Sequence, residues 1–324
     1  MSKSNGIDTE DIVATGKSKK KRNGFLKEMH INWQLYVMLI LPVAYLLIFA
    51  YGPMLGIQIA FKDYKMAEGI WGSKWIGFDH FIRFFKSMQF PLVMKNTLFL
   101  SLYNLLVSTP MALFLAVCVN YLTNAKYKKT VQMITYAPHF ISVVIMVAIM
   151  NQMLATRTGI VNNIIELLGF TRIEFLGKAQ YFRHLYVWSG VWQEAGWNSI
   201  IYISALAGID PQIHEAAIVD GATKIRRIFS IDLPSIMPTF IILMIMNVGR
   251  IMNVGFTKVF AMQNTLNKTY SEVIETYVYN ITFTSGLPNY SYTTAIGLFN
   301  SVIGVILITV VNGLSRKLTE SSLW

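Results

Sequence analysis

Six long apolar stretches, separated by polar segments, dominate the sequence. Each is 21 to 27 residues long, and a helix needs roughly 20 apolar residues to cross a bilayer core. The pattern predicts an all-α integral membrane protein with six transmembrane helices, over about 35–61, 96–122, 131–154, 188–209, 236–256 and 291–314.

The first stretch resembles a signal peptide only in the basic segment that precedes it. Its apolar core is too long and no small-residue cleavage site follows, so we expect an uncleaved helix. Pro42 and Pro53 interrupt it, which membrane helices tolerate where neighbours satisfy the freed backbone groups. Residues 1–30 are polar and basic and predict a flexible tail, whereas 31–324 predict a single transmembrane domain.

The composition supports the membrane interpretation. Apolar residues make up 54% of the chain and charged residues 14%, against about 25% charged in soluble proteins. This balance excludes a disordered chain and an ordinary soluble enzyme, and the single cysteine, Cys118, excludes a disulfide scaffold. The net charge is +11. Most of the Lys and Arg residues lie between the apolar stretches, so membrane topology and contact with lipid headgroups explain this charge better than nucleic-acid binding does.

The positive charges also set the orientation. Six spans place both termini on one side of the membrane. Residues 1–30 hold seven Lys and Arg, and three more lie at Lys126, Lys128 and Lys129. Cytoplasmic segments are enriched in such residues, so we expect cytoplasmic termini, together with a cytoplasmic segment 210–235.

No enzymatic motif is visible. Gly16, Lys17 and Ser18 look like the end of a phosphate-binding loop, but that motif requires Gly where Asp11 stands. No zinc-protease motif or hydrolase elbow is found, and the five His show no ligand spacing. We therefore expect no catalytic residue, metal or cofactor in this chain, and no enzyme.

The segment from Asp210 to Pro238 carries the most information. Asp210 followed by Pro211 is typical of a helix start, and Gly221 predicts a sharp turn. A second short helix follows, which we expect Pro234 to end. The pattern predicts a helix–turn–helix elbow that suits docking against another protein. A solvated loop with an interfacial helix is the alternative.

The elbow contains a spaced set of residues that resembles the EAA signature of ABC importer membrane subunits. The set comprises Glu215, Ala216, Ala217, Asp220, Gly221, Ala222, Ile231, Leu233 and Pro234. Residues 137–142, 197–206 and 292–298 resemble the carbohydrate branch related to maltose permeases, and above all its polysaccharide and complex-oligosaccharide permeases. The resemblance covers about residues 35–324.

The resemblance implies a type I ABC importer permease fold in a prokaryotic cell membrane. A second, related permease would complete the pore, and an extracytoplasmic solute-binding protein would deliver an oligosaccharide or polysaccharide fragment. Two cytoplasmic ATP-binding subunits would hold ATP and Mg²⁺ and dock on the elbow, whose nine residues would couple ATP hydrolysis to alternating access.

Two ionisable residues stand out within the predicted spans, Glu194 and Arg250. Such residues are costly in a membrane and are usually functional. Their similar predicted depths allow an ion pair that either packs two helices or lines a sugar pathway, and both interpretations stay open. Amides and indole rings suit sugars, so the candidate pathway comprises Trp192, Gln193, Glu194, Trp197, Asn198, Asn247, Arg250, Asn253, Asn151 and Gln152.

Three other functions remain as alternatives. The chain would then be an importer permease for a non-sugar solute, an ion-coupled secondary transporter, or a membrane scaffold. Ion coupling usually requires several intramembrane carboxylates, and only Glu194 is clearly within a span. The elbow argues against a scaffold.

Overall fold

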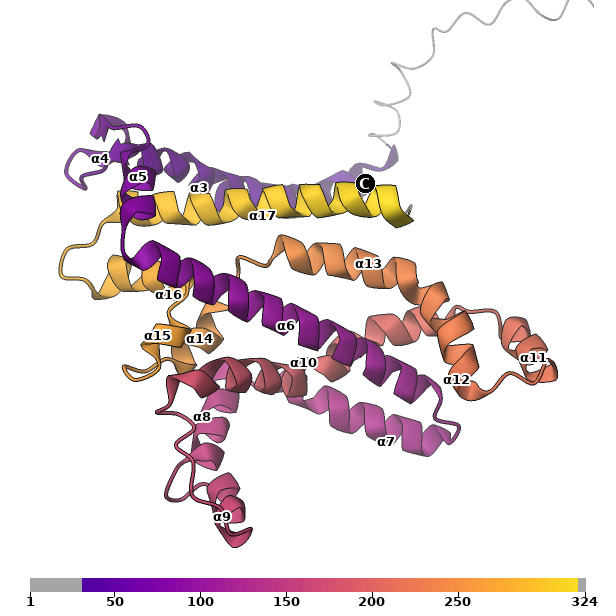
Figure 1. Ribbon diagram of the computed structural model, residues 1–324. Coiled ribbons are helices and arrows are strands. Elements are labelled where there is room, and N and C mark those ends of the chain that lie inside the picture. Colours follow the sequence, from indigo (N-terminus) through magenta and orange to yellow (C-terminus); the bar gives the residue numbers. More distant parts are fainter. Residues whose placement is uncertain (1–30, 320–324) are drawn as a thin grey trace, which may run out of the picture. The chain divides into compact units, whose positions relative to one another are not determined.

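The computed structural model describes residues 31–319, which form helices apart from one short two-stranded ribbon (Figure 1). The tail predicted for residues 1–30 lies outside the described residues. The chain divides after Ile57 into two compact units, which are described in turn.

The first unit is a run of exposed helical turns. It contains α2 (Trp33–Tyr45), the π-helical turn η1 (Leu46–Tyr51) and α3 (Gly52–Met54), and none of their residues is buried. The 3-10 helix η2 (Leu55–Phe61) follows. The whole stretch Trp33–Phe61 is long and apolar enough to cross a membrane, in agreement with the first predicted span.

Three further helices of the described residues qualify as spans by length and apolarity: α6 (Gln89–Asn120), the helix Lys224–Gly249, and Tyr290–Lys317 within α17 (Tyr290–Thr319). A bent pair of helices raises the total of candidate spans from four to five. The fourth predicted span, 188–209, lies in α10 (Phe182–Ala207) except for its last two residues, and α10 packs along α6. α10 is not among the four candidate spans, because polar residues such as Gln193 and Glu194 lower its mean hydropathy.

The predicted continuous span 131–154 is wrong. The chain forms α7 (Ala125–Tyr136), a 3-10 turn η3 (Ala137–Phe140) and α8 (Val143–Leu154), with a bend of 101° before α8. Pro138 lacks the N–H that would continue the helix, and Ile141 and Ser142 adopt extended backbone angles. These two features break the span.

The predicted helix end at Pro234 is also wrong, and so are the limits 236–256 of the fifth span. α12 (Lys224–Arg227), the π-helical turn η5 (Ile228–Asp232) and α13 (Leu233–Gly249) form one uninterrupted helix. Pro234 lies in the first turn of α13, where the π-helical turn accommodates its missing N–H.

The connections between spans contain short elements. Between η2 and α6 lie antiparallel strands β1 (Lys62–Asp63) and β2 (Lys74–Trp75), with α4 (Gly69–Gly72) and α5 (Asp79–Lys86). After α8 lies α9 (Ile160–Leu167), and η4 (Ala179–Tyr181) precedes α10. Before α17 lie α14 (Phe256–Met262), α15 (Lys268–Ser271), α16 (Ile274–Tyr279) and η6 (Asn280–Thr284).

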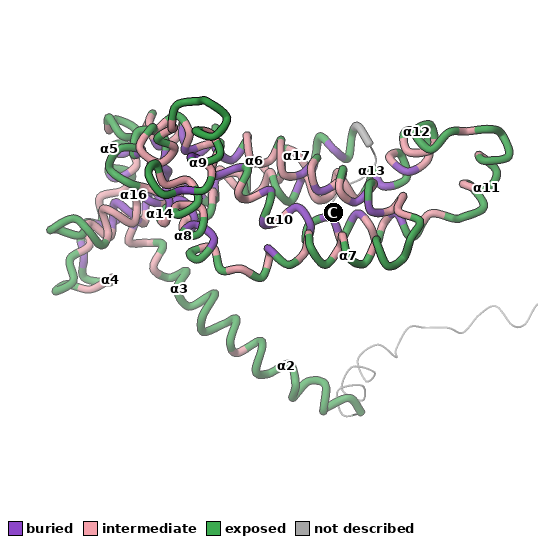
Figure 2. The backbone as a smooth tube through the Cα atoms, turned by 90° about the horizontal axis from the view of Figure 1, so that it is seen from below, coloured by how far each residue is buried: buried purple, intermediate pink, exposed green. Residues whose placement is uncertain are grey.

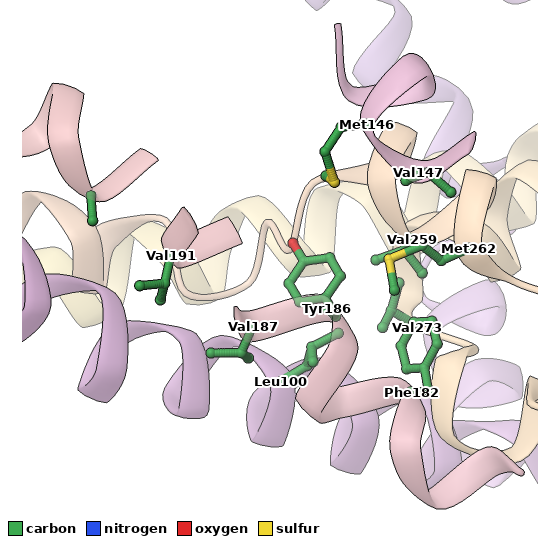
Figure 3. Close-up of a cluster of buried hydrophobic side chains, with 11 residues drawn as sticks. Leu100, Met146, Val147, Phe182, Tyr186, Val187, Val191, Val259, Met262 and Val273 are labelled. Carbon is green, nitrogen blue, oxygen red and sulfur yellow. The ribbon is translucent and has the colours of Figure 1, made fainter. Parts of the chain in front are cut away.

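Three clusters of buried apolar side chains hold the second unit together. The largest joins α6, α8, α10 and α14 around Tyr186 and Val187 (Figure 3). A second surrounds Phe84 of α5, and a third surrounds Tyr202 of α10. By contrast, no residue of α11 (Pro211–Val219) or α12 is buried (Figure 2).

The packing of α7 against α10 depends on Gly196. A Cβ there would overlap the backbone carbonyl of Thr135, so Gly196→Ala is expected to cost about 1–3 kcal/mol of stability. The measurement is thermal unfolding of the purified protein. Gly297→Ala in α17 is the control, because a Cβ there meets nothing within 4 Å. Equal melting temperatures for the two variants would contradict the close contact.

Candidate functional site

A polar cavity of about 400 Å³ lies between α6, α10 and α13 and the segment that follows α13. Its α10 wall contains Gly190, Gln193, Glu194 and Asn198, whose spacing of three and four residues places them on one helix face. The facing wall of α6 presents polar side chains at the same spacing, namely Ser101, Asn104 and Ser108.

Six of the ten predicted pathway residues line this cavity: Gln193, Glu194, Asn198, Asn247, Arg250 and Asn253. The other four do not. Trp192 is 55% exposed, and Asn151 and Gln152 lie in the last turn of α8. The indole of Trp197 stacks on the ring of His139, with ring centroids 4.3 Å apart.

The break between α7 and α8 supplies hydrogen-bond partners for two cavity residues. The Nδ1 of His139 lies 2.8 Å from Oε2 of Glu194. The Nε2 of Gln193 donates to the carbonyl oxygen of Ile141 at 2.7 Å. The suggested ion pair between Glu194 and Arg250 is absent from the described residues, because η3 brings His139 to the carboxylate instead.

Arg250 lies at the cavity but not inside a helix. It follows the last residue of α13 as its C-cap and is exposed. The carbonyl groups at a helix C-terminus favour a cation. Arg250 can therefore keep its charge at the cavity without a carboxylate partner.

Lys258 of α14 lines the cavity and was not predicted from the sequence. Its Nζ donates to the carbonyl oxygen of Tyr186 at 2.8 Å and lies 4.6 Å from the centre of the Tyr186 ring. A Cβ at Gly190 would come within 2.9 Å of that nitrogen, so the glycine makes room for the lysine. Lys258 was counted as loop charge because it follows the predicted span 236–256.

The lining therefore contains two basic side chains, Arg250 and Lys258, and one carboxylate, that of Glu194. Burial lowers the pKa of the Lys258 amine to about 7, so an anion beside it would favour its protonated form. The polar stripe on α6 also escaped the sequence analysis, although the spacing of Ser101, Asn104 and Ser108 inside an apolar stretch was a usable signal.

The predicted elbow is confirmed in its local geometry. Asp210 caps α11 by accepting a hydrogen bond from the N–H of Gln212 at 2.9 Å. Gly221 follows with φ of +78°, a left-handed conformation that favours glycine. The side chain of Thr223 then caps α12 at the N–H of Arg226.

The EAA-like residues lie around the turn of this elbow. Glu215, Ala216 and Ala217 are on α11, and Asp220 is its C-cap. A depression of about 230 Å³ is lined by Ala217, Asp220, Ala222, Arg226, Arg227, Ser230 and Ile231. Leu233 packs against the cluster around Tyr202, and Pro234 is exposed in the first turn of α13.

The elbow formed by α11 and α12 also exposes apolar side chains. Val219 is 87% exposed, and Ile213, Ile218, Ile225 and Phe229 are also exposed. Four of these residues are neighbours in the sequence of residues that line the depression, and exposed apolar residues of this kind are typical of interaction sites.

Residues 94–320 match the model of the family described as the binding-protein-dependent transport system inner membrane component. The chain belongs to this family. It is 42% identical over 290 residues to Protein LplB of Bacillus subtilis (strain 168), covering 90% of this chain and 91% of that protein. It is 39% identical over 314 residues to the polygalacturonan/rhamnogalacturonan transport system permease protein YteP of the same organism, covering 97% of each.

Two solved structures are similar throughout. One is a bacterial ABC transporter involved in the import of the acidic polysaccharide alginate, with a TM-score of 0.84, 39% identity, and coverage of 91% of this chain and 99% of that chain. The other is a bacterial alginate ABC transporter in complex with an alginate pentasaccharide-bound periplasmic protein, with a TM-score of 0.84 and 38% identity over 92% of this chain. The resemblance to ABC importer permeases is thereby confirmed.

The partner of Glu194 can be tested by two double-mutant cycles on purified protein. Combining His139→Ala with Glu194→Gln is expected to reveal a coupling energy of about 0.5–3 kcal/mol, because the two side chains are hydrogen bonded. The matched cycle of Arg250→Ala with Glu194→Gln is expected to give additive effects. A larger coupling with Arg250 than with His139 would contradict the observed pairing.

Proposed function

We propose that this chain is one half of the translocation pore of an ATP-driven importer, and that its cargo is an acidic oligosaccharide such as a chain of uronic acid residues. The observation that carries the proposal is the polar cavity in which Arg250 and Lys258 outnumber Glu194. The cargo class agrees with the substrates named for the similar proteins, polygalacturonan, rhamnogalacturonan and alginate.

The cavity chemistry suits such a cargo. Amides and hydroxyls along α6, α10 and α13 can exchange hydrogen bonds with sugar hydroxyls. The basic side chains of Arg250 and Lys258 can hold a carboxylate, and a guanidinium binds one through two parallel hydrogen bonds. The hydrogen bond with His139 engages the Glu194 carboxylate, which reduces its repulsion of an anionic sugar.

In this proposal the elbow receives an ATP-binding subunit, which holds ATP and Mg²⁺. A second related permease completes the pore, a second ATP-binding subunit docks on that permease, and an extracytoplasmic binding protein delivers the cargo. Both termini and the elbow lie on the cytoplasmic side. The exposed apolar residues of the elbow and its depression support the docking role.

Charge selectivity is tested by uptake into vesicles that contain the complete transport complex. Arg250→Gln and Lys258→Met are each expected to lower ATP-dependent uptake of an oligogalacturonide by about tenfold or more, because a hydrogen bond to a charged group contributes about 1.5–3 kcal/mol. The exposed Arg157→Gln, in the connection after α8, is the control. Preferential uptake of a neutral oligosaccharide by the wild type would contradict the cargo class, and uptake driven by an ion gradient without ATP would contradict the importer.

ATPase docking is tested by co-purification. Glu215→Lys reverses a charge on α11, and Gly221→Pro prevents the left-handed turn at φ of +78°. Both are expected to lose the ATP-binding subunit and ATP-dependent uptake. Glu68→Lys is the matched control, because that glutamate is exposed at the start of α4 and far from the elbow in sequence. Retention of the ATP-binding subunit by both elbow variants would overturn the docking role.

A further inference from the structure

A buried carboxylate lies at the base of the elbow. The side chain of Asp232, the last residue of η5, has no exposed surface. Its Oδ2 accepts a hydrogen bond from the phenol of Tyr121 at 2.7 Å. Its Oδ1 lies 3.3 Å from Nε2 of His214, without hydrogen-bond geometry. The guanidinium of Arg227 lies over the Tyr121 ring, 5.8 Å from its centre.

These contacts join three elements. Tyr121 follows the last residue of α6, Asp232 precedes the first residue of α13, and His214 is on α11 directly before Glu215. Burial, followed by the hydrogen bond to Asp232, raises the pKa of Tyr121 to about 12. The phenol therefore remains a donor at physiological pH.

α11 has few other means of attachment. None of its residues is buried, so apolar packing holds it weakly. Gly208 precedes it and Gly221 follows it. His214 turns toward the buried carboxylate and leaves only 23% of its side chain exposed. Because Oδ1 of Asp232 is buried without a hydrogen bond, a nearby imidazole N–H is the group that this oxygen favours.

We propose that His214, Asp232 and Tyr121 form a link that carries movement of α11 to α6 and α13, so that these three residues are positioning residues for the coupling of ATP hydrolysis to transport. The proposal rests on the docking role of the elbow proposed above. The π-helical turn that ends at Asp232 supports it, because such turns in helices are frequent at functional sites.

The test compares the rate of ATP hydrolysis with the rate of oligogalacturonide uptake in vesicles that contain the complete complex. Tyr121→Phe and His214→Ala are expected to leave hydrolysis within about twofold of wild type and to lower the sugar moved per ATP by about fivefold. His214→Gln keeps an N–H donor and is expected to restore most of that ratio. Tyr103→Phe is the matched control, because it removes a tyrosine–histidine hydrogen bond of 2.9 Å elsewhere on α6.

Each outcome is decisive. A wild-type ratio of sugar to ATP in both link variants would overturn the link. Parallel losses of hydrolysis and uptake at a constant ratio would assign the three residues a merely structural role and would also overturn it. If the wild-type complex shows no ATP-dependent uptake, the proposed function is overturned instead. The wild type is measured first, so this result is distinguished from failure of the link.

Discussion

The contact between α10 and the broken helix beside it organises the centre of the molecule. α10 carries Gln193 and Glu194 inside a bundle of apolar helices, where unpartnered polar groups are costly. Both are partnered by the turn that interrupts the neighbouring span, through the carbonyl of Ile141 and the ring of His139. Gly196 lets that neighbour approach closely enough for the contact. The break between α7 and α8 therefore supplies the hydrogen-bond partners that allow α10 to contain these two polar residues.

The cavity depends on this arrangement. Because the broken span engages one side of α10, the adjacent face of the helix is directed to the polar stripe of α6. The chain after α13 then closes the cavity through Gly255, whose φ of +99° redirects the backbone into α14. This turn brings Lys258 to Tyr186, beside a glycine that leaves space for its amine.

The features that could be predicted from the sequence are those set by neighbours in the chain. Apolar length located the spans, and the Asp210 cap and Gly221 turn located the elbow. The predictions that failed mostly concern features that depend on residues distant in the sequence. The position of His139 against Glu194 and the approach of Lys258 to Tyr186 are decided by packing between segments far apart in the sequence. The passage of the helix through Pro234 depends instead on a π-helical turn that the sequence pattern did not predict. The bend of 101° was foreshadowed only by Pro138, which many membrane helices accommodate without breaking.

The elbow meets a different constraint from the cavity. A surface proposed to receive a partner must be exposed, so it cannot be anchored by burying its own apolar residues. Here α11 is joined through the Gly221 turn to α12, which is the first part of a long helix that contains the buried Asp232. That helix has 26 residues, a length of about 39 Å at 1.5 Å per residue, and it ends at Gly249 beside the cavity residues Asn247 and Arg250. Had Pro234 ended the helix, movement of the elbow would be absorbed at the break. Because the helix is uninterrupted, the proposed docking at its exposed end would displace the polar groups at the other end.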